Sequence, residues 1–222
     1  MKLIRTAIFL LASIAIAGCN GIPRPSLLSG PDEGFFRVYS GFPTPYLFAG
    51  SAVQWNEDYA VTVAHIPFIS GTVYECSTGC DLKFFKHPAN GKIPKWRSAV
   101  PGERVTAMGA SPLMFSVKGQ GRASKLSFKN TDETGGERYA IHDAPLVKGM
   151  SGGPVYGDDG AVLGINIGFF STTLNPGNTK IASYDRVSLY VRYQTIEREW
   201  QHHLTAIGHS ERRLMVTSKS NP

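Results

Sequence analysis

Residues 149–154 have the sequence GMSGGP, in which a serine lies between glycines. Glycine adopts backbone angles that other residues resist, so this segment can form a tight turn that exposes the hydroxyl of Ser151. The same turn can direct consecutive backbone N–H groups at one point, where they would bind a developing oxyanion. A serine nucleophile beside such donors is what acyl transfer needs. The alternative is a glycine-rich hairpin that contains a serine by chance.

A serine nucleophile needs a general base, and we expect His65 to supply it. His65 follows the apolar residues 61–64 and precedes a proline-containing loop, so it can point into a cleft at the end of a strand. His142 lies closer to Ser151 along the chain, but it leads into the glycine turn. We expect His142 to be a surface or supporting residue.

The base needs a carboxylate that orients it, and Asp81 is the candidate. It begins the segment 81–86 (DLKFFK), and it lies after the histidine and before the serine. An aspartate at the start of a strand is more often a turn residue. Asp58 precedes His65, so it does not lie between the histidine and the serine as Asp81 does.

Short apolar segments separated by turn residues predict many short strands. The chain also has 24 glycines and 14 prolines, which suit an all-β protein. The expected strands are 35–39, 46–53, 59–63, 72–74, 82–85 and 104–108, then 122–128, 138–141, 154–156, 161–167 and 180–184. A helix is expected at 191–204, where Tyr193, Ile196, Trp200 and Leu204 recur at helical spacing.

In chain order, residues 61–65 (VTVAH), 81–86 and 149–154 resemble the three motifs of the chymotrypsin/trypsin superfamily of serine peptidases. Residues 101–112 resemble the link before the end of the first barrel in bacterial members. The flanking residues 143–145 (DAP) and 164–166 (GIN) resemble the HtrA-type branch. The gap between His65 and Asp81 is shorter than in the digestive enzymes. Met150 stands where activated digestive enzymes have an aspartate, so activation by a new N-terminus is not expected.

The resemblance implies two six-stranded antiparallel β-barrels followed by a C-terminal α-helix. The peptidase domain would span 35–205, with barrels at about 35–115 and 120–190. It also implies a serine endopeptidase with the triad His65, Asp81 and Ser151, the oxyanion hole of Gly149 and Ser151, and no cofactor or metal. The substrate would be a protein or peptide.

The specificity pocket in this superfamily is formed by residues just before the serine and by a later strand. Pro145 stands where trypsin-like members have the carboxylate that selects Arg or Lys. The expected walls are apolar, and an unpaired charge would be costly to bury there. These walls are Leu146, Val147, Ile167 and Phe169. We therefore expect a preference for small to medium apolar residues.

Residues 1–18 have the pattern of a secretory signal, in which Lys2 and Arg5 precede the apolar segment 6–17. The sequence IAGC at 16–19 resembles the lipobox of bacterial lipoproteins, which implies lipidation of Cys19 and a membrane anchor. Asn20 directly follows the cysteine and favours a location at the outer membrane. The expected location is the bacterial cell envelope, facing the periplasm or the cell surface, with 19–34 as a flexible tether and 206–222 as a flexible tail.

The remaining cysteines, Cys76 and Cys80, are expected to form a local disulfide in an exported protein. A metal site that also uses His65 or His87 is the alternative. The net charge of +6 includes two cations of the leader, and there is no basic stripe with interleaved aromatics, so nucleic acid is not an expected partner.

Two other functions fit the sequence less well. One is a catalytically inactive protease-fold lipoprotein that binds a protein partner, although all three triad residues have chemically competent side chains. The other is an esterase of the α/β-hydrolase type, which fits poorly because its histidine follows the serine and its strands alternate with helices.

Overall fold

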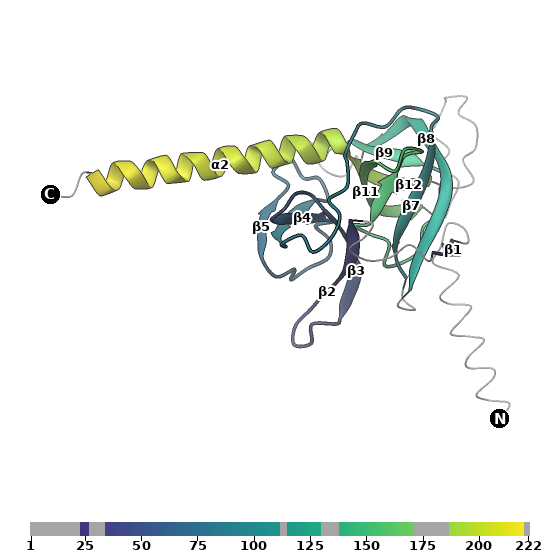
Figure 1. The fold of residues 1–222 in the computed structure, drawn as a ribbon, viewed down its shortest axis with the longest axis horizontal. Coiled ribbons are helices and arrows are strands. Elements are labelled where there is room, and N and C mark those ends of the chain that lie inside the picture. Colours follow the sequence, from purple (N-terminus) through teal and green to yellow (C-terminus); the bar gives the residue numbers. More distant parts are fainter. Residues whose placement is uncertain (1–22, 27–33, 112–114, 130–137, 171–186, 220–222) are drawn as a thin grey trace.

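The computed structural model describes residues 23–26, 34–111, 115–129, 138–170 and 187–219. These residues form two antiparallel sheets and one helix (Figure 1). The elements are β1 (Arg24–Pro25), β2 (Phe35–Ser40), β3 (Phe48–Gln54), β4 (Tyr59–Thr62), β5 (Thr72–Glu75), β6 (Lys83–Lys86), β7 (Arg104–Ala110), β8 (Ser116–Lys129), β9 (Arg138–His142), β10 (Pro154–Tyr156), β11 (Val162–Phe170), β12 (Val187–Arg192) and α2 (Tyr193–Lys219).

The first sheet has five strands in the order β2-β3-β4-β6-β5. Its inner face is apolar, and Val53, Val61 and Phe84 are fully buried there. The start of α2 covers this face, because Trp200 lies 5.0 Å from the ring of Phe84 and Ile196 is fully buried in the same cluster. Burial of these large side chains ties the helix to the first sheet.

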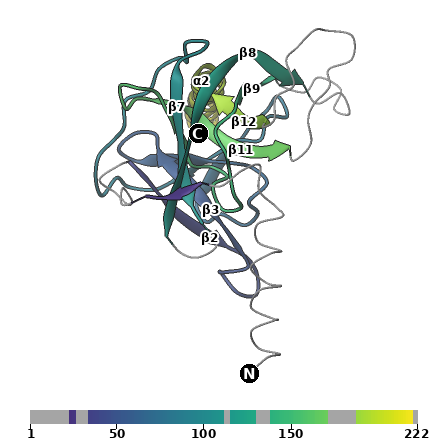
Figure 2. The same cartoon turned by 90° about the vertical axis from the view of Figure 1, so that its right-hand side faces the viewer.

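The second sheet has seven strands in the order β1-β8-β7-β10-β11-β12-β9, and β8 also pairs with β9. This extra pairing closes β7–β12 into a six-stranded barrel, with β1 added outside it. The strand β8 can serve both neighbours because it is long and shifts its register between Ala123 and Ser127, where a bulge lets the strand bend. Figure 2 shows these strands gathered on one side of β2 and β3.

The expected fold class is confirmed: two antiparallel β layers with a C-terminal helix. The strand count differs from the expected six and six, since the described residues form a five-stranded first sheet. The strand at 104–110 was expected in the first barrel, yet β7 pairs with β8 and β10 in the second. It also contacts β2 and β3, so it lies between the two layers.

The segment 19–34 was expected to be a tether, but part of it is held in the second sheet. Arg24 and Pro25 pair with Lys118 and Val117 of β8, and the amide of Ser26 donates to the carbonyl of Ser116 at 2.9 Å. A proline is tolerated here because β1 is an edge strand.

The C-terminal elements also differ from expectation. The strand expected at 180–184 lies outside the described residues, and β12 was not predicted because it continues into α2 without a turn. The helix extends through Lys219, whereas a flexible tail was expected from 206 (Figure 1). Gly208 lies within this part of the helix, where a glycine costs about 1 kcal/mol relative to alanine. Within the described ranges, no helix has both the length and the apolar character needed to cross a membrane.

Candidate active site

His65 lies three residues beyond the end of β4, at the edge of the first sheet. Val61 and Val63 are fully buried, which sets the point where the chain leaves the sheet. The imidazole of His65 is exposed by contrast, with 48% of its side-chain surface accessible. A histidine in this position can reach a substrate.

Asp81 lies directly beside His65, although 16 residues separate them in the sequence. The strands β4 and β6 are antiparallel neighbours with Thr62 opposite Lys83, so the end of one strand meets the start of the other. The backbone N–H of His65 donates to Asp81 Oδ1 at 2.8 Å, and Nδ1 of the ring lies 2.5 Å from Asp81 Oδ2. An ionised carboxylate only accepts, so this contact places the proton on Nδ1 and leaves Nε2 as the basic nitrogen.

Ser151 lies in the loop between β9 and β10, on a turn that requires glycine. Gly149 and Gly152 have φ of +90° and +80°, in the left-handed region that favours glycine. A side chain at Gly152 would also collide with the carbonyl of Ser51 and the hydroxyl of Thr62. The serine turn therefore packs directly on β3 and β4, and β4 is the strand that leads to His65.

Ser51 connects the serine turn to the first sheet, and sequence reasoning missed it. It is fully buried in β3, and its hydroxyl donates to the carbonyl of Gly149 at 2.9 Å while accepting the amide of Ala110 at 2.8 Å. Its backbone N–H donates to the carbonyl of Ser151 at 2.8 Å. Serines are common in strands, so the sequence around Ser51 offered no signal that would have identified this role.

Asn166 of β11 supports the turn from the other side, and it too was assigned no role from the sequence. Its side-chain amide donates to the carbonyls of Gly153 and Pro154 at 3.0 and 3.2 Å. Its own carbonyl accepts the amide of Gly152 at 2.7 Å. Because Asn166 is fully buried, these bonds replace water and hold the glycines in place.

The hydroxyl of Ser151 donates to the carbonyl of Ile167 at 3.0 Å and not to His65 in this structure. The two loops are nevertheless neighbours, because the side chain of Ile66 and the carbonyl of Ser151 both lie against Gly50. In substrate-free enzymes, catalytic hydrogen bonds are often loose.

The backbone N–H groups of Gly149 and Ser151 donate to no acceptor in the part of the chain that the structure describes. The turn that carries them is anchored by Met150, which is fully buried and whose amide donates to the carbonyl of Val147 at 3.2 Å. This anchoring holds the two N–H groups of the expected oxyanion hole on one rigid turn.

The four expected pocket residues divide into two groups. Leu146 is only 2% exposed and packs in the second core cluster, so it supports the site from within. Val147, Ile167 and Phe169 are half-buried. These three side chains are therefore partly exposed.

His142 has a structural position, as expected. It is fully buried, and its Nε2 lies 3.1 Å from Asn166 Oδ1. Burial lowers its pKa to about 4, so the ring is neutral at pH 7. It therefore supports the barrel beneath the serine turn.

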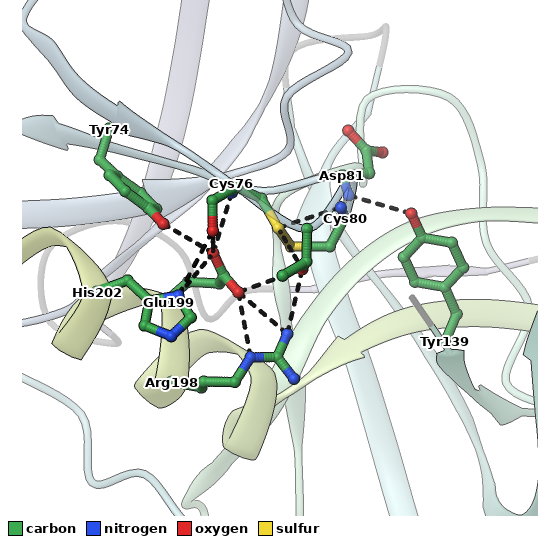
Figure 3. Close-up of polar contacts among 10 residues, drawn as sticks. Tyr74, Cys76, Cys80, Asp81, Tyr139, Arg198, Glu199 and His202 are labelled. Carbon is green, nitrogen blue, oxygen red and sulfur yellow. Dashed lines mark hydrogen bonds and ion pairs between the residues drawn. A yellow bond between two sulfur atoms is a disulfide. The ribbon is translucent and has the colours of Figure 1, made fainter. Parts of the chain in front are cut away.

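Cys76 and Cys80 are joined by a disulfide, which confirms the predicted pairing. Both sulfurs are used in this bond, and His87 instead contacts Gln54 and stacks on Phe36. The ionisable group that lies beside the disulfide is Glu199 of α2. The loop closed by the disulfide leads directly into Asp81, whose backbone N–H donates to the hydroxyl of Tyr139 at 3.1 Å (Figure 3).

Comparison with solved structures finds similar folds among serine proteases. The Rv3671c protease of M. tuberculosis H37Rv, in an inactive form, superposes with a TM-score of 0.58 at 16% identity, over 82% of this chain and 97% of that one. The serine endoprotease from Yersinia pestis gives 0.58 at 16% identity, over 81% and 68%. The HtrA-type protease AlgW, in a variant with a bound tripeptide, gives 0.60 at 18% identity, over 78% and 60%.

No protein-family model matches the chain, and no curated protein matches its sequence. The structural similarity extends over most of this chain. The chain therefore has the chymotrypsin-like fold of the HtrA-type serine proteases.

Proposed function

We propose that this chain is a serine endopeptidase that hydrolyses protein or peptide substrates through Ser151, His65 and Asp81. The observation that carries the proposal is the contact between Asp81 and His65, in which one carboxylate binds both the ring and the backbone of the histidine. The serine turn packs on β3 and on β4, the strand that leads to this exposed imidazole.

The reaction would begin when Nε2 of His65 accepts the proton of the Ser151 hydroxyl. The serine oxygen attacks the peptide carbonyl, and the resulting oxyanion accepts hydrogen bonds from the N–H groups of Gly149 and Ser151. His65 then donates the proton to the leaving amine as the C–N bond breaks, and water hydrolyses the acyl-enzyme in a second cycle. Asp81 stabilises the imidazolium and keeps its proton on Nδ1.

Ser151 has to exchange one partner before this reaction starts. A rotation of its side chain would move the hydroxyl from the carbonyl of Ile167 towards His65, and substrate binding could drive that exchange. The same contact favours the alternative function, a catalytically inactive protein that binds a protein partner.

A fluorophosphonate probe separates the two functions, because it reacts only with an activated serine. We expect the full chain to be labelled in proportion to time and the Ser151→Ala variant to remain unlabelled. A folded wild-type chain that takes no label and cleaves no casein would support the non-catalytic alternative.

We also propose that the mature protein is anchored by lipidation of Cys19, in the bacterial envelope and at the outer membrane. Cys19 lies outside the described residues, so the sequence motif supports this proposal. The attachment of Arg24 to β8 adds a geometric consequence. Five residues span at most about 18 Å, so the domain would be held close to the bilayer surface.

Metabolic labelling with a fatty-acid analogue should modify the wild-type chain and not Cys19→Ser, because the thiol is the acceptor. Cys80→Ser, which removes a cysteine of the folded domain, should be labelled like the wild type. Label that persists in Cys19→Ser would exclude this site.

The half-buried side chains of Val147, Ile167 and Phe169 support an apolar specificity pocket. We expect cleavage after Ala, Val or Leu to exceed cleavage after Arg, Lys or Glu by about tenfold or more, because a charge would lose its hydration without gaining a partner. Profiling of cleavage sites in a peptide library measures this ratio. A preference for basic or acidic residues would show that other side chains form the pocket.

A further inference from the structure

Glu199 is a fully buried carboxylate on α2, far along the chain from the proposed triad. Its Oε2 accepts the hydroxyl of Tyr74 at 2.8 Å, and it also accepts both the backbone N–H and the hydroxyl of Ser77 at 3.1 Å. Its Oε1 accepts the hydroxyl of Thr78 at 3.2 Å and two N–H groups of Arg198 at 3.1 Å. Figure 3 shows these bonds converging on the one side chain.

These contacts offset the cost of burying a charge. Burial by itself raises the pKa of Glu199, but the hydrogen bonds from Tyr74, Ser77 and Arg198 outweigh it and hold the pKa below its usual range. The side chain is therefore an anion at neutral pH. An anion surrounded by donors fixes the positions of those donors more firmly than a neutral group does.

Half of these hydrogen bonds come from the ring of residues 76–80, which the disulfide closes. Within this ring, the amide of Cys80 donates to the sulfur of Cys76 at 3.1 Å. The amide of Cys76 donates to the carbonyl of Leu82 at 3.0 Å, so the ring is joined to the segment that carries Asp81. Ser77 and Thr78 lie on the side of the ring that α2 holds, and Asp81 immediately follows its other end.

Asp81 depends on this main-chain support. Within the described residues, its carboxylate contacts only His65. Its backbone has one further support, the hydroxyl of Tyr139 from β9. The direction of the carboxylate is therefore set by where the disulfide ring and Tyr139 place the backbone.

We propose that Glu199 is a positioning residue for the catalytic pair, acting on Asp81 through the ring of residues 76–80. The proposal rests on the proposed peptidase function. It makes α2 part of the machinery that aligns His65, in addition to its packing on the first sheet. A misplacement of a catalytic group by about 1 Å can cost about 100-fold in rate.

The test compares Glu199→Gln with Glu197→Gln in the full chain. Glu197 lies two positions away on α2 and accepts a bond from Gln201, so its replacement removes the same charge without touching the ring. Glu199→Gln directs an amide at donors and breaks part of the network. We expect kcat to fall 10- to 100-fold with KM within twofold, whereas Glu197→Gln keeps both values.

A spectroscopic signature distinguishes positioning from general stability. The proton shared by His65 Nδ1 and Asp81 should give a downfield ¹H NMR signal in the wild type and in Glu197→Gln. In folded Glu199→Gln it should shift upfield or broaden through exchange with water. Unchanged kcat and an unchanged signal in folded Glu199→Gln would overturn the proposal.

A second variant covers the case in which Glu199→Gln does not fold. Ser77→Ala combined with Thr78→Val removes two hydroxyl contacts and leaves Glu199 in place, so a smaller change in the same direction is expected. No change of kcat or of the signal in that variant would also overturn the proposal. The NMR signal needs no turnover, so it still tests Glu199 if the wild type proves not to be a peptidase.

Discussion

Replacement of Ser151 by alanine is expected to lower kcat by about 10⁶-fold, because the acyl-enzyme can no longer form. Folding should change little. The lost hydroxyl makes a single bond, to the carbonyl of Ile167, which is worth about 1 kcal/mol. The measurement is turnover of casein or of a library-derived peptide, together with the free energy of unfolding.

Ser124→Ala is the matched control for this experiment. It removes a serine hydroxyl from β8, where that hydroxyl accepts the amide of Leu126 and lies outside the turn. Activity within twofold of the wild type is expected. If Ser151→Ala retained near-wild-type turnover while remaining folded, a different nucleophile would have to be sought.

Replacement of Asp81 by asparagine is expected to lower kcat by about 10⁴-fold with the fold intact. The amide oxygen can still accept the backbone N–H of His65, so the geometry should survive. The amide nitrogen, however, can donate to Nδ1 and thereby favours the tautomer whose Nε2 carries the proton. That tautomer cannot accept the proton of Ser151. Single-turnover kinetics and the rate of fluorophosphonate labelling measure the loss.

Asp58→Asn serves as the control because Asp58 also lies near His65 in the sequence. In the structure it belongs to the turn before β4, and its backbone carbonyl accepts the amide of His87. Its replacement should leave kcat within twofold of the wild type. A large loss in Asp58→Asn together with little loss in Asp81→Asn would contradict the assigned carboxylate.

The catalytic candidates could be chosen from the sequence because their signals are local. A serine between glycines indicates an exposed hydroxyl on a tight turn, and the φ values at Gly149 and Gly152 agree with that interpretation. The disulfide was predictable for the same reason, since Cys76 and Cys80 lie four positions apart. Alternating apolar segments likewise indicated the antiparallel layers before any contact was known.

The supports of the site were not predictable, because they join segments far apart in the chain. Ser51 contacts the serine turn across 98 positions, and Glu199 contacts Ser77 across 122. A serine in a strand and a glutamate in a helix are common, so neither has a local signature. For Leu146, the apolar character predicted a pocket wall, but its packing places it in the core.

The all-β class, the order of His65, Asp81 and Ser151, and the local disulfide were predictable, because each depends on residue type and short-range spacing. The pairing of β7 with the second barrel, the closure of β8 onto β9 and the contact between Asp81 and His65 became visible in the folded chain. These outcomes follow from strand register and burial, which are set by the pairing of distant segments. The role proposed for Glu199 also depends on distant segments. A buried carboxylate acquires such a role only from the donors that the folded chain brings to it.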